Sequence, residues 1–316
     1  MSDSSKRKRP LVADKRTVGK GSKPPRKPVA KKAPAKRKPA RRAPARPKGP
    51  IGWLAALVRW VFHLIWTIVW RVTAVAVLMV ALAVGYFYTT LPPLDALLDG
   101  RARGSVTLKD RYGDVFAWRG DQFGGVVTAD SVSPALKNAV IATEDKRFYR
   151  HFGVSPRGIA SAVKINLSEG RGPLSGHGGS TITQQVAKLL CLGEPYDASS
   201  GQTEKEYEAE CRRSSLSRKG KEALFSMAME AKYSKDDILS IYLNRAYMGG
   251  GAFGAEAAAQ RFFGKPAAAL KPAEGAMLAG LLTAPTTLSP TNNLDRSQSR
   301  AATVIRLMED QGYLSK

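Results

Sequence analysis

The chain has 316 residues, enough for one or two domains with a sizeable core, and its 50 Lys+Arg against 26 Asp+Glu give a formal net charge of +24. Much of the excess lies in residues 1–50, which contain 19 of the Lys+Arg, two acidic residues, nine of the 19 prolines and no aromatic side chain. This composition excludes a packed core there, because the segment cannot bury enough apolar surface to offset the chain entropy lost on folding.

Residues 1–50 are therefore predicted to be a disordered basic tail. Runs such as KKAPAKRKPARRAPARPK bind polyanions, either nucleic acid or acidic lipid headgroups. The apolar segments that follow favour the lipid surface and argue against nucleic acid. A solvated tail that only sets the orientation of the chain in a membrane remains the alternative to a binding role.

Two apolar segments follow the tail. Residues 72–91, VTAVAVLMVALAVGYFYTTL, carry no charge and have the length of a helix that crosses the ~30 Å hydrocarbon core of a bilayer. Residues 51–71 carry two arginines and a histidine among four tryptophans, which is typical of an interfacial helix or of an N-terminal extension of the span. The tail is too long for the basic region of a signal peptide. The positive-inside rule therefore predicts a single-pass protein with a cytoplasmic N-terminus, and a buried core helix is the alternative for 72–91.

The remainder is predicted to be mainly α-helical. Residues 92–132 form a linker in which VTLKDRYGDVFAW alternates around a Tyr-Gly-Asp turn, as in a short hairpin. From Ser133 the periodicity is helical, with no parallel-sheet alternation, and glycines separate the segments. The sequence thus predicts one compact domain over 133–316. Its expected helices cover residues 133–150, 155–168, 180–190, 218–232, 235–245, 254–263 and 272–282.

The first of these helices carries two adjacent carboxylates, Glu144 and Asp145. Ser133 followed by Pro134 is a favourable helix start, with an N-cap and a proline at the first position. Four-residue steps place Glu144 on the apolar face that also bears Phe148. A carboxylate on a burying face costs free energy unless it has a partner or a task. It is either a salt-bridged residue at the edge of the core or a functional acid.

A glycine-rich segment, GHGGSTITQQVAKLL, begins at Gly176. Thr181 and Gln184 have the spacing of a capping box at a helix start, and the exposed N–H groups of such a start bind anions. Lys188, one turn beyond Gln184, adds a positive charge on the same face. An ordinary glycine-rich turn with a capped helix is the alternative, and the spacing is not that of a Walker loop.

A third segment, SRKGKEALFSMAME, places Arg218, Lys219 and Glu222 on one helix surface. The alternative is a solvated helix whose intrahelical ion pairs contribute a few tenths of a kcal/mol each. Together with Lys188, these residues give more cations than acids. A glycoside hydrolase needs a protonated acid for its leaving group, whereas a transferase that expels a diphosphate needs cations there and one base. The cations therefore favour the transferase.

Two cysteines, Cys191 and Cys211, flank the polar, acidic stretch LGEPYDASSGQTEKEYEAE, which lacks an apolar period and is interpreted as an inserted loop. In an oxidising compartment they are expected to form a disulfide, with two free thiols as the alternative. The absence of a nearby histidine makes a zinc site a poor interpretation.

Five stretches resemble, in order, the five motifs of the family 51 glycosyltransferases, the peptidoglycan polymerases found in class A penicillin-binding proteins and as stand-alone membrane-bound transglycosylases. They are EDKRFYRHFG from Glu144, GGSTITQQ from Gly178, RKGKE from Arg218, SKDDILSIYLN from Ser234 and GAFGAEAAAQRFFGK from Gly251. The resemblance covers about residues 106–313. It implies a lysozyme-like α-helical head with a small membrane-proximal jaw, in the cytoplasmic membrane of a bacterium.

The implied reaction adds lipid II to a glycan attached to undecaprenyl diphosphate, with inversion and a β-1,4 product. Glu144 matches the general base, and Glu222 matches the second acidic position, which acts through a divalent cation or by ordering the cations. Mg²⁺ or Mn²⁺ is left open, because the metal requirement varies in the family. The residues implied to bind substrate or support the site are Asp145, Phe148, His151, Ser180, Thr181, Gln184, Gln185, Lys188, Arg218, Lys219 and Asn244.

The sequence also departs from the family pattern. The segment between Cys191 and Cys211 is an insertion between the second and third motifs. The sequence contains Ser-x-x-Lys, the pattern of a transpeptidase nucleophile, but not the other motifs that accompany it in transpeptidases. The chain is therefore either monofunctional or the front part of a longer protein. Cell-wall synthesis proteins are the expected partners. The competing functions are a membrane-bound lytic enzyme and a non-enzymatic membrane scaffold with a polyanion-binding tail.

Overall fold

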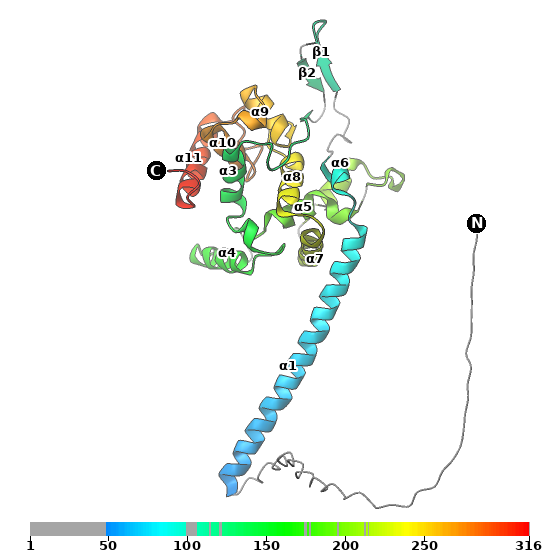
Figure 1. Cartoon of the computed structure of the whole chain (residues 1–316), viewed down its shortest axis with the longest axis vertical. Helices are drawn as coiled ribbons and strands as arrows, with labels where there is room; N and C mark the ends of the chain where they lie inside the picture. The colour runs from blue at the N-terminus through cyan, green and yellow to red at the C-terminus, as the bar shows by residue number, and fades with distance from the viewer. Residues whose placement is uncertain are drawn as a thin grey trace, which may run out of the picture. The chain divides into compact units, whose positions relative to one another are not determined.

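The structure, a computed structural model, describes residues 49–98, 106–113, 115–119, 122–173, 176, 178–194, 196–211, 213 and 215–315. Helices dominate these residues, so the predicted mainly α class is confirmed (Figure 1). The chain divides inside its first helix into a unit that ends at Leu64 and a unit that begins at Ile65. The predicted disordered tail lies outside the described residues, except for its last two positions.

The elements follow one another in a simple order. The α-helices are α1 (Gly49–Thr90), α2 (Leu94–Leu98), α3 (Pro134–Glu144), α4 (Pro156–Ser168), α5 (Ile182–Leu189), α6 (Glu204–Cys211), α7 (Leu216–Lys232), α8 (Lys235–Arg245), α9 (Ala255–Phe263), α10 (Pro272–Leu281) and α11 (Leu294–Asp310). Short 3-10 helices are η1 (Phe148–Arg150), η2 (Cys191–Gly193), η3 (Ala198–Ser200) and η4 (Ala267–Ala269). The strands are β1 (Val106–Lys109), β2 (Val115–Arg119), β3 (Gln122–Phe123) and β4 (Ala252–Phe253).

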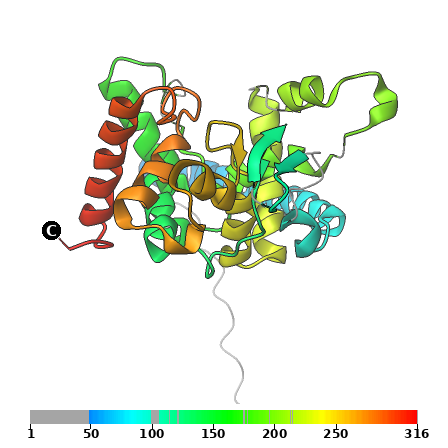
Figure 2. The ribbon, with the colours of Figure 1, turned by 90° about the horizontal axis from the view of Figure 1, so that it is seen from above.

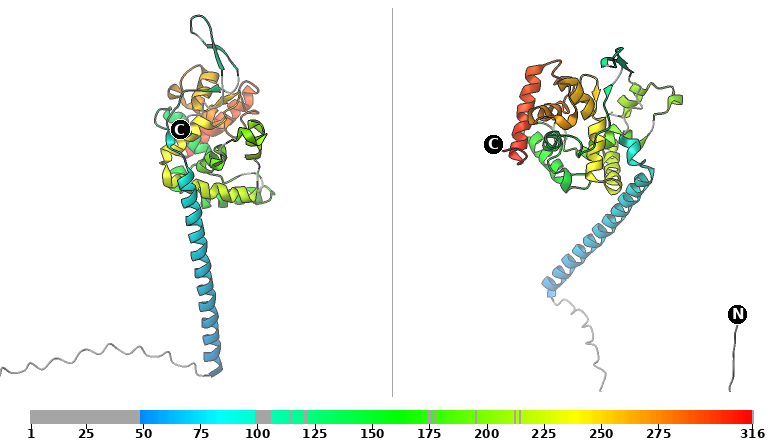
Figure 3. Two further views of the ribbon diagram at one scale, coloured as in Figure 1. Left: turned by 90° about the vertical axis from the view of Figure 1, so that its right-hand side faces the viewer. Right: turned by 45° about the horizontal axis from the view of Figure 1, so that its top comes forward.

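Helix α1 runs without a break through both apolar segments, 51–71 and 72–91, and ends one residue before the second segment does (Figure 3). It is the one helix of the described residues that is long and apolar enough to cross a membrane. Its 42 residues correspond to about 63 Å at 1.5 Å per residue, roughly twice the thickness of a hydrocarbon core. A bilayer core would therefore cover about half of the helix.

The end of α1 is attached to α7. The Phe87 ring meets the buried Phe225 ring edge-on, with centroids 5.5 Å apart. The Lys232 ammonium donates to the carbonyl of Leu91, just after the helix, and lies 5.5 Å from the centre of the Tyr88 ring. These contacts tie the exit of the candidate spanning helix to the helix that carries the third motif.

Helices α3, α10 and α11 pack against one another and form one side of the core (Figure 2). Ser133 caps α3 by accepting from the N–H of Leu136, and Pro134 takes the first helical position, as predicted. Gly275 of α10 permits close packing, because a Cβ there would lie 2.9 Å from the nitrogen of Leu136. The other side of the core is built from α5, which packs against both α7 and α8.

The two sheets are small. Strands β1 and β2 pair antiparallel around the Tyr112-Gly113 turn, where the hairpin was expected. Strands β3 and β4 pair in parallel over two residues, Gln122 with Ala252 and Phe123 with Phe253. The sequence, in which no parallel pattern is evident, does not predict this second pair, because two residues are too few to show a period.

Three helix predictions are corrected by the structure. The helix expected over 133–150 ends at Glu144, so Phe148 lies in η1 and not on the same helical face. The insertion interpreted as a loop contains α6. Helix α11, which was not predicted, buries Ala301, Val304 and Met308.

Candidate active site

The last turn of α3 brings Glu144 against α5. The Glu144 carboxylate is partly exposed, and its Oε2 accepts from the Gln185 amide Nε2 at 2.8 Å. The Gln185 Oε1 in turn accepts from the Tyr242 hydroxyl of α8 at 3.0 Å. Because an ionised carboxylate only accepts hydrogen bonds, the amide nitrogen faces Glu144 and the amide oxygen faces the tyrosine. Tyr242, Gln185 and Glu144 thus form a directed relay of donors.

The surroundings of Glu144 hold its proton more tightly than water would. Burial raises the pKa of Glu144 above its ordinary value, and the charge of Asp145 raises it further. The Gln185 hydrogen bond and the charge of Arg300 act in the opposite direction and lower this pKa. Burial, and then the charge of Glu144, raise the pKa of Tyr242 well above its ordinary value, so the tyrosine keeps the proton that it donates. A carboxylate with a raised pKa is a stronger base, as general base catalysis requires.

Asp145 has a different environment from its neighbour. Its Oδ2 accepts from the backbone N–H of Ile182 at 3.2 Å and lies 2.8 Å from Nε2 of His151. The side chains of Asp145 and His151 are each 6% exposed. These contacts end α3 at Asp145, because the side chain binds the start of α5 in place of a further helical turn. Asp145 and His151 therefore position the segment that carries Glu144.

Phe148 fills the core beneath this turn. Its ring is fully buried and lies edge-on to the His151 ring, with centroids 6.3 Å apart. The Lys235 ammonium lies 4.5 Å from the centre of the Phe148 ring and pairs with Glu230 at 2.7 Å. The structure places Phe148 as a packing residue of the site.

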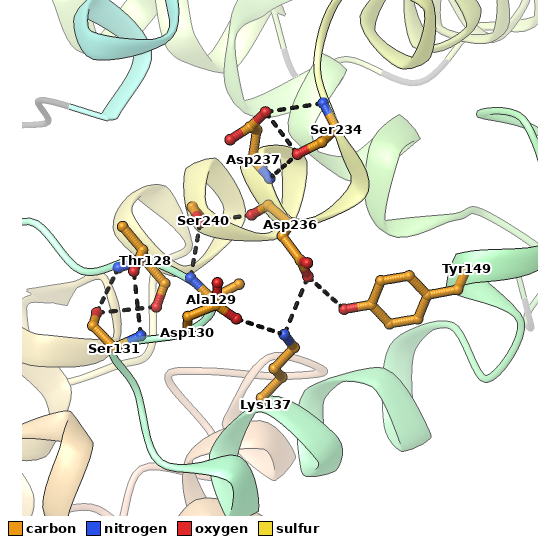
Figure 4. A network of polar contacts seen from close by, with 10 residues as sticks. All are labelled: Thr128, Ala129, Asp130, Ser131, Lys137, Tyr149, Ser234, Asp236, Asp237 and Ser240. Carbon is orange, nitrogen blue, oxygen red and sulfur yellow. Dashed lines mark hydrogen bonds and ion pairs between the residues drawn. The ribbon is translucent and has the colours of Figure 1, made fainter.

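A second group of polar residues supports the same turn from outside (Figure 4). Asp236 of α8 accepts from the Tyr149 hydroxyl at 2.7 Å and from Lys137 of α3 at 3.1 Å, and Lys137 also reaches Asp130 at 3.4 Å. The Tyr149 hydrogen bond, and then the Lys137 bond and charge, lower the pKa of Asp236 against the effect of burial. Burial first, and then Asp236, raise the pKa of Tyr149 to about 12. This network joins the first turn of α3, through Lys137, to η1 and to the first turn of α8.

The predicted capping box at the start of α5 is confirmed. Thr181 accepts from the N–H of Gln184, and the Gln184 side chain accepts from the N–H of Thr181. The Thr181 hydroxyl also donates to the carbonyl of Gly153 at 2.6 Å. Gly153 has φ +75°, and a Cβ there would lie 2.8 Å from the main chain of Ser226. Thr181 and Gln184 are buried and take part in capping, and their expected contact with substrate stays a prediction.

The start of α5 binds one anionic group of the protein itself, the Asp145 carboxylate. The N–H of Ile182 donates to Asp145, and the N–H groups of Gln184 and Gln185 bond to Thr181. The positive end of the helix dipole therefore stabilises the Asp145 carboxylate. A further bound anion at this helix start stays a prediction.

The third motif forms a cationic cluster, Arg218 and Lys219, around the buried Glu222 at the start of α7. The Glu222 side chain is 1% exposed and pairs with Arg218 at 3.2 Å and with Lys219 at 2.8 Å. Lys219 also donates to the Ser180 hydroxyl at 2.8 Å, which links the cluster to the segment before α5. The Arg218 Nε is buried and has no hydrogen-bond partner among the described residues. The solvated helix considered as an alternative is excluded by the burial of Glu222.

The insertion reaches this cluster through its second cysteine. Cys191 and Cys211 form a disulfide, with Cα atoms 5.4 Å apart. The carbonyl of Cys211 accepts from Arg218 Nη1 at 2.6 Å. The end of the insertion is therefore a direct neighbour of the cationic cluster.

Two predicted residues have other surroundings. Lys188 lies in the last turn of α5 and is partly exposed. Asn244 is 8% exposed, and its amide accepts from the N–H of Val127 at 3.0 Å and donates to the carbonyls of Val127 and Ser240. Both amide hydrogens and the oxygen of Asn244 therefore bind main chain, and its expected role in substrate binding stays a prediction.

The cluster does not fit a divalent cation as it stands. Both Glu222 oxygens face cations of the protein, and within the described residues no three or more His, Cys, Asp or Glu side chains gather where they could hold a metal ion. Of the two roles expected for Glu222, the ordering of Arg218 and Lys219 is the one that these contacts support.

Sequence reasoning missed Tyr242 and Arg300. Tyr242 belongs to the YLN end of the fourth motif, and this place in a motif was the signal that could have identified it. Its hydrogen bond with Gln185 could not be predicted from a local pattern, because the two residues are 57 positions apart in the sequence. Arg300 lies on α11, a helix that the sequence analysis did not predict.

Comparison with known proteins finds relatives that are penicillin-binding proteins. The chain is 36% identical over 231 residues to penicillin-binding protein 1A of Escherichia coli strain K12 (73% of this chain, 25% of the relative). It is 38% identical over 237 residues to penicillin-binding protein 1A of Neisseria flavescens (75% and 27%) and 37% identical over 212 residues to penicillin-binding protein 1A/1B of Bacillus subtilis strain 168 (67% and 21%). The chain thus spans about a quarter of the length of these relatives.

Among solved structures, the crystal structure of penicillin-binding protein 1A from Haemophilus influenzae matches with a TM-score of 0.36 and 22% identity, over 68% of this chain and 19% of that one. The family model described as transglycosylase matches residues 113–309, which include all five motifs and both acidic positions. This match covers more than half of the sequence. The chain belongs to the transglycosylase family, the family 51 peptidoglycan glycosyltransferases.

Proposed function

We propose that this chain polymerises lipid II into β-1,4-linked glycan with Glu144 as the general base. The observation that carries the proposal is the partly buried Glu144 carboxylate, which is oriented by Gln185 and whose pKa burial raises. Glu144 takes the proton of the 4-hydroxyl of the acceptor GlcNAc. That oxygen then forms a bond to the anomeric carbon of the donor MurNAc, the bond from this carbon to the diphosphate oxygen breaks, and the configuration inverts.

The leaving diphosphate is assigned to the cationic cluster. Arg218 and Lys219 share the single negative charge of Glu222, so the three residues keep a net charge of +1. The buried Arg218 Nε without a partner among the described residues offers a donor to an incoming oxygen. Cations held in place before the reaction stabilise the charge that develops on a leaving group. Ser180 of the second motif and Lys188, which lies three residues beyond that motif, are proposed to contribute.

The membrane arrangement is also a proposal. Helix α1 supplies one candidate span. The positive-inside rule then places the basic N-terminal segment in the cytoplasm and the catalytic domain on the outer side of the cytoplasmic membrane, where the lipid-linked substrate presents its sugars. The acidic and cationic groups described above act on that side.

The test is polymerisation of labelled lipid II by detergent-solubilised protein, with Glu144→Gln beside the wild type. Wild-type protein is expected to form glycan polymer, and Glu144→Gln is expected to form none while keeping its fold, because the amide cannot take the proton. Asp310→Asn, a carboxylate-to-amide change at the exposed end of α11, is the matched control and is expected to retain activity.

Polymer formation by Glu144→Gln would refute the assignment of the base. A parallel incubation with finished peptidoglycan separates the competing enzyme, since release of fragments without polymer from lipid II would identify a lytic activity. Fold retention is checked by circular dichroism and thermal unfolding of each variant.

A further inference from the structure

The insertion between the second and third motifs is a small ordered unit closed by the Cys191–Cys211 disulfide. Inside it, the Tyr196 and Tyr207 rings lie 5.6 Å apart, and the Tyr207 hydroxyl donates to the carbonyl of Glu194. These contacts join the two ends of the insertion to each other. In the described part of the chain no other helix or strand packs extensively against α6, so the disulfide is its main attachment to the end of α5 (Figure 2).

The base of the insertion has an unusual backbone. Cys191 and Leu192 have φ values of 49° and 58°, in the left-handed region that residues other than glycine seldom adopt. Such conformations cost free energy and persist only where surrounding structure imposes them. Here the adjoining helix α5 and the covalent link to Cys211 supply that constraint.

The other end of the disulfide bears on the proposed diphosphate site. Arg218 is held from two sides, by the Cys211 carbonyl at Nη1 and by Glu222 at Nη2. A guanidinium that is held at both terminal nitrogens has a fixed plane, and the N–H of its third nitrogen, Nε, then has a fixed direction. Loss of the Cys211 contact would leave Arg218 attached to Glu222 alone.

We propose that the Cys191–Cys211 disulfide is a positioning element for Arg218, so that binding of a prenyl diphosphate depends on the oxidised state of this pair. The inference rests on the proposed function, which supplies the diphosphate. Reduction by a dithiol moves two electrons to the disulfide. The S–S bond breaks, each sulfur takes a proton, and the dithiol becomes a cyclic disulfide. The Cys211 carbonyl is then no longer tied to the end of α5, and Arg218 loses its second anchor.

The test measures binding of farnesyl diphosphate to the purified full chain in detergent, oxidised and after treatment with dithiothreitol. Because the chain has two cysteines, any effect of the reductant on the protein acts through this pair. We expect binding to weaken about tenfold on reduction, as for loss of a hydrogen bond to a charged group. Reoxidation should restore it, and Cys191→Ala with Cys211→Ala should bind weakly and ignore the reductant.

Two further variants separate positioning from general loss of structure. In Arg218→Ala, reduction is expected to have no further effect, because the disulfide acts through the missing guanidinium. In Lys219→Ala, which leaves the Cys211 contact in place, reduction should still weaken binding about tenfold. Tyr207→Phe, which loosens the insertion elsewhere, should retain the response of the wild type.

Equal binding by oxidised and reduced wild-type protein would overturn this inference alone. A full response to reductant in Arg218→Ala would also overturn it, because the effect would then bypass Arg218. If the oxidised wild type fails to bind farnesyl diphosphate, the diphosphate site of the proposed function is refuted, and the inference with it. Inorganic diphosphate as a second probe shows whether the headgroup is sufficient for the effect.

Discussion

Replacing Glu222 with glutamine removes the negative charge that Arg218 and Lys219 share. The contact with Arg218 is an ion pair at 3.2 Å between side chains that are 1% and 15% exposed, and a close contact with such a charged group contributes about 1.5–3 kcal/mol. The pair with Lys219 is shorter, but the lysine is 49% exposed, so solvent reduces its contribution to about 0.2–1 kcal/mol. Glu222→Gln should therefore lower the free energy of unfolding by about 2–4 kcal/mol.

The assay is denaturant unfolding of the purified variant at neutral pH, with thermal unfolding as a second measurement. A loss of this size lowers the melting temperature of a domain of this length by about 4–16 °C. Glu144→Gln is the matched control, because it changes a partly exposed carboxylate and should leave the free energy of unfolding nearly unchanged. If Glu222→Gln unfolds within about 0.5 kcal/mol of the wild type, the desolvation cost of the buried charge cancels its attraction, and the reasoning fails.

Gln185→Leu removes the hydrogen bond that lowers the pKa of Glu144, so Glu144 should become protonated at a higher pH than in the wild type. The acidic limb of the plot of kcat/KM against pH should therefore move to higher pH. An acidic limb at the wild-type position would contradict the relay from Gln185 to Glu144. Asn244→Leu should lower the free energy of unfolding by about 2–4 kcal/mol, because it leaves buried main-chain groups without hydrogen-bond partners. Urea unfolding measures this change, and a free energy of unfolding equal to that of the wild type would contradict the prediction. Folding lowers the pKa of Asp236, chiefly through the Tyr149 hydrogen bond. The ionised Asp236 carboxylate therefore stabilises the fold at pH values above its pKa in the unfolded chain. This contribution to the free energy of unfolding is lost as the pH falls through the pKa of Asp236 in the folded protein. Asp236→Asn should accordingly flatten the acid side of the stability–pH curve, and a curve as steep as that of the wild type would count against it.

Local rules in the sequence predict several helices closely. Helices α4, α8 and α10 begin at Ser-Pro, Ser-x-x-Asp and Lys-Pro signals, and the capping box of α8 is formed between Ser234 and Asp237. The end of α3 depends instead on a contact between Asp145 and Ile182, which are 37 residues apart. The face that α11 buries includes the small residues Ser297 and Ala301, so its apolar period is weak in the sequence. Helix α6 buries too little apolar surface to show a period.

The sequence likewise predicts part of the candidate site and leaves the rest unpredicted. The motifs identify Glu144 and the cations of α7 from the sequence, because their residue types and order are distinctive. The relay through Gln185 to Tyr242 joins three helices, and the grip on Arg218 depends on a main-chain carbonyl of an insertion. Contacts of this kind depend on tertiary packing, which no local pattern records.

Helix α7 has one end at the exit of α1 and the other at the cationic cluster. Fourteen residues separate Lys232, which binds the main chain after α1, from Arg218, and an α-helix of that length is a stiff spacer of about 21 Å. The distance between the exit of α1 and the guanidinium is therefore set by a rigid rod and does not vary with the loops around it. The lipid-linked substrate of the proposed function, if it enters along α1, would meet the Arg218 guanidinium at a fixed distance from the exit of α1.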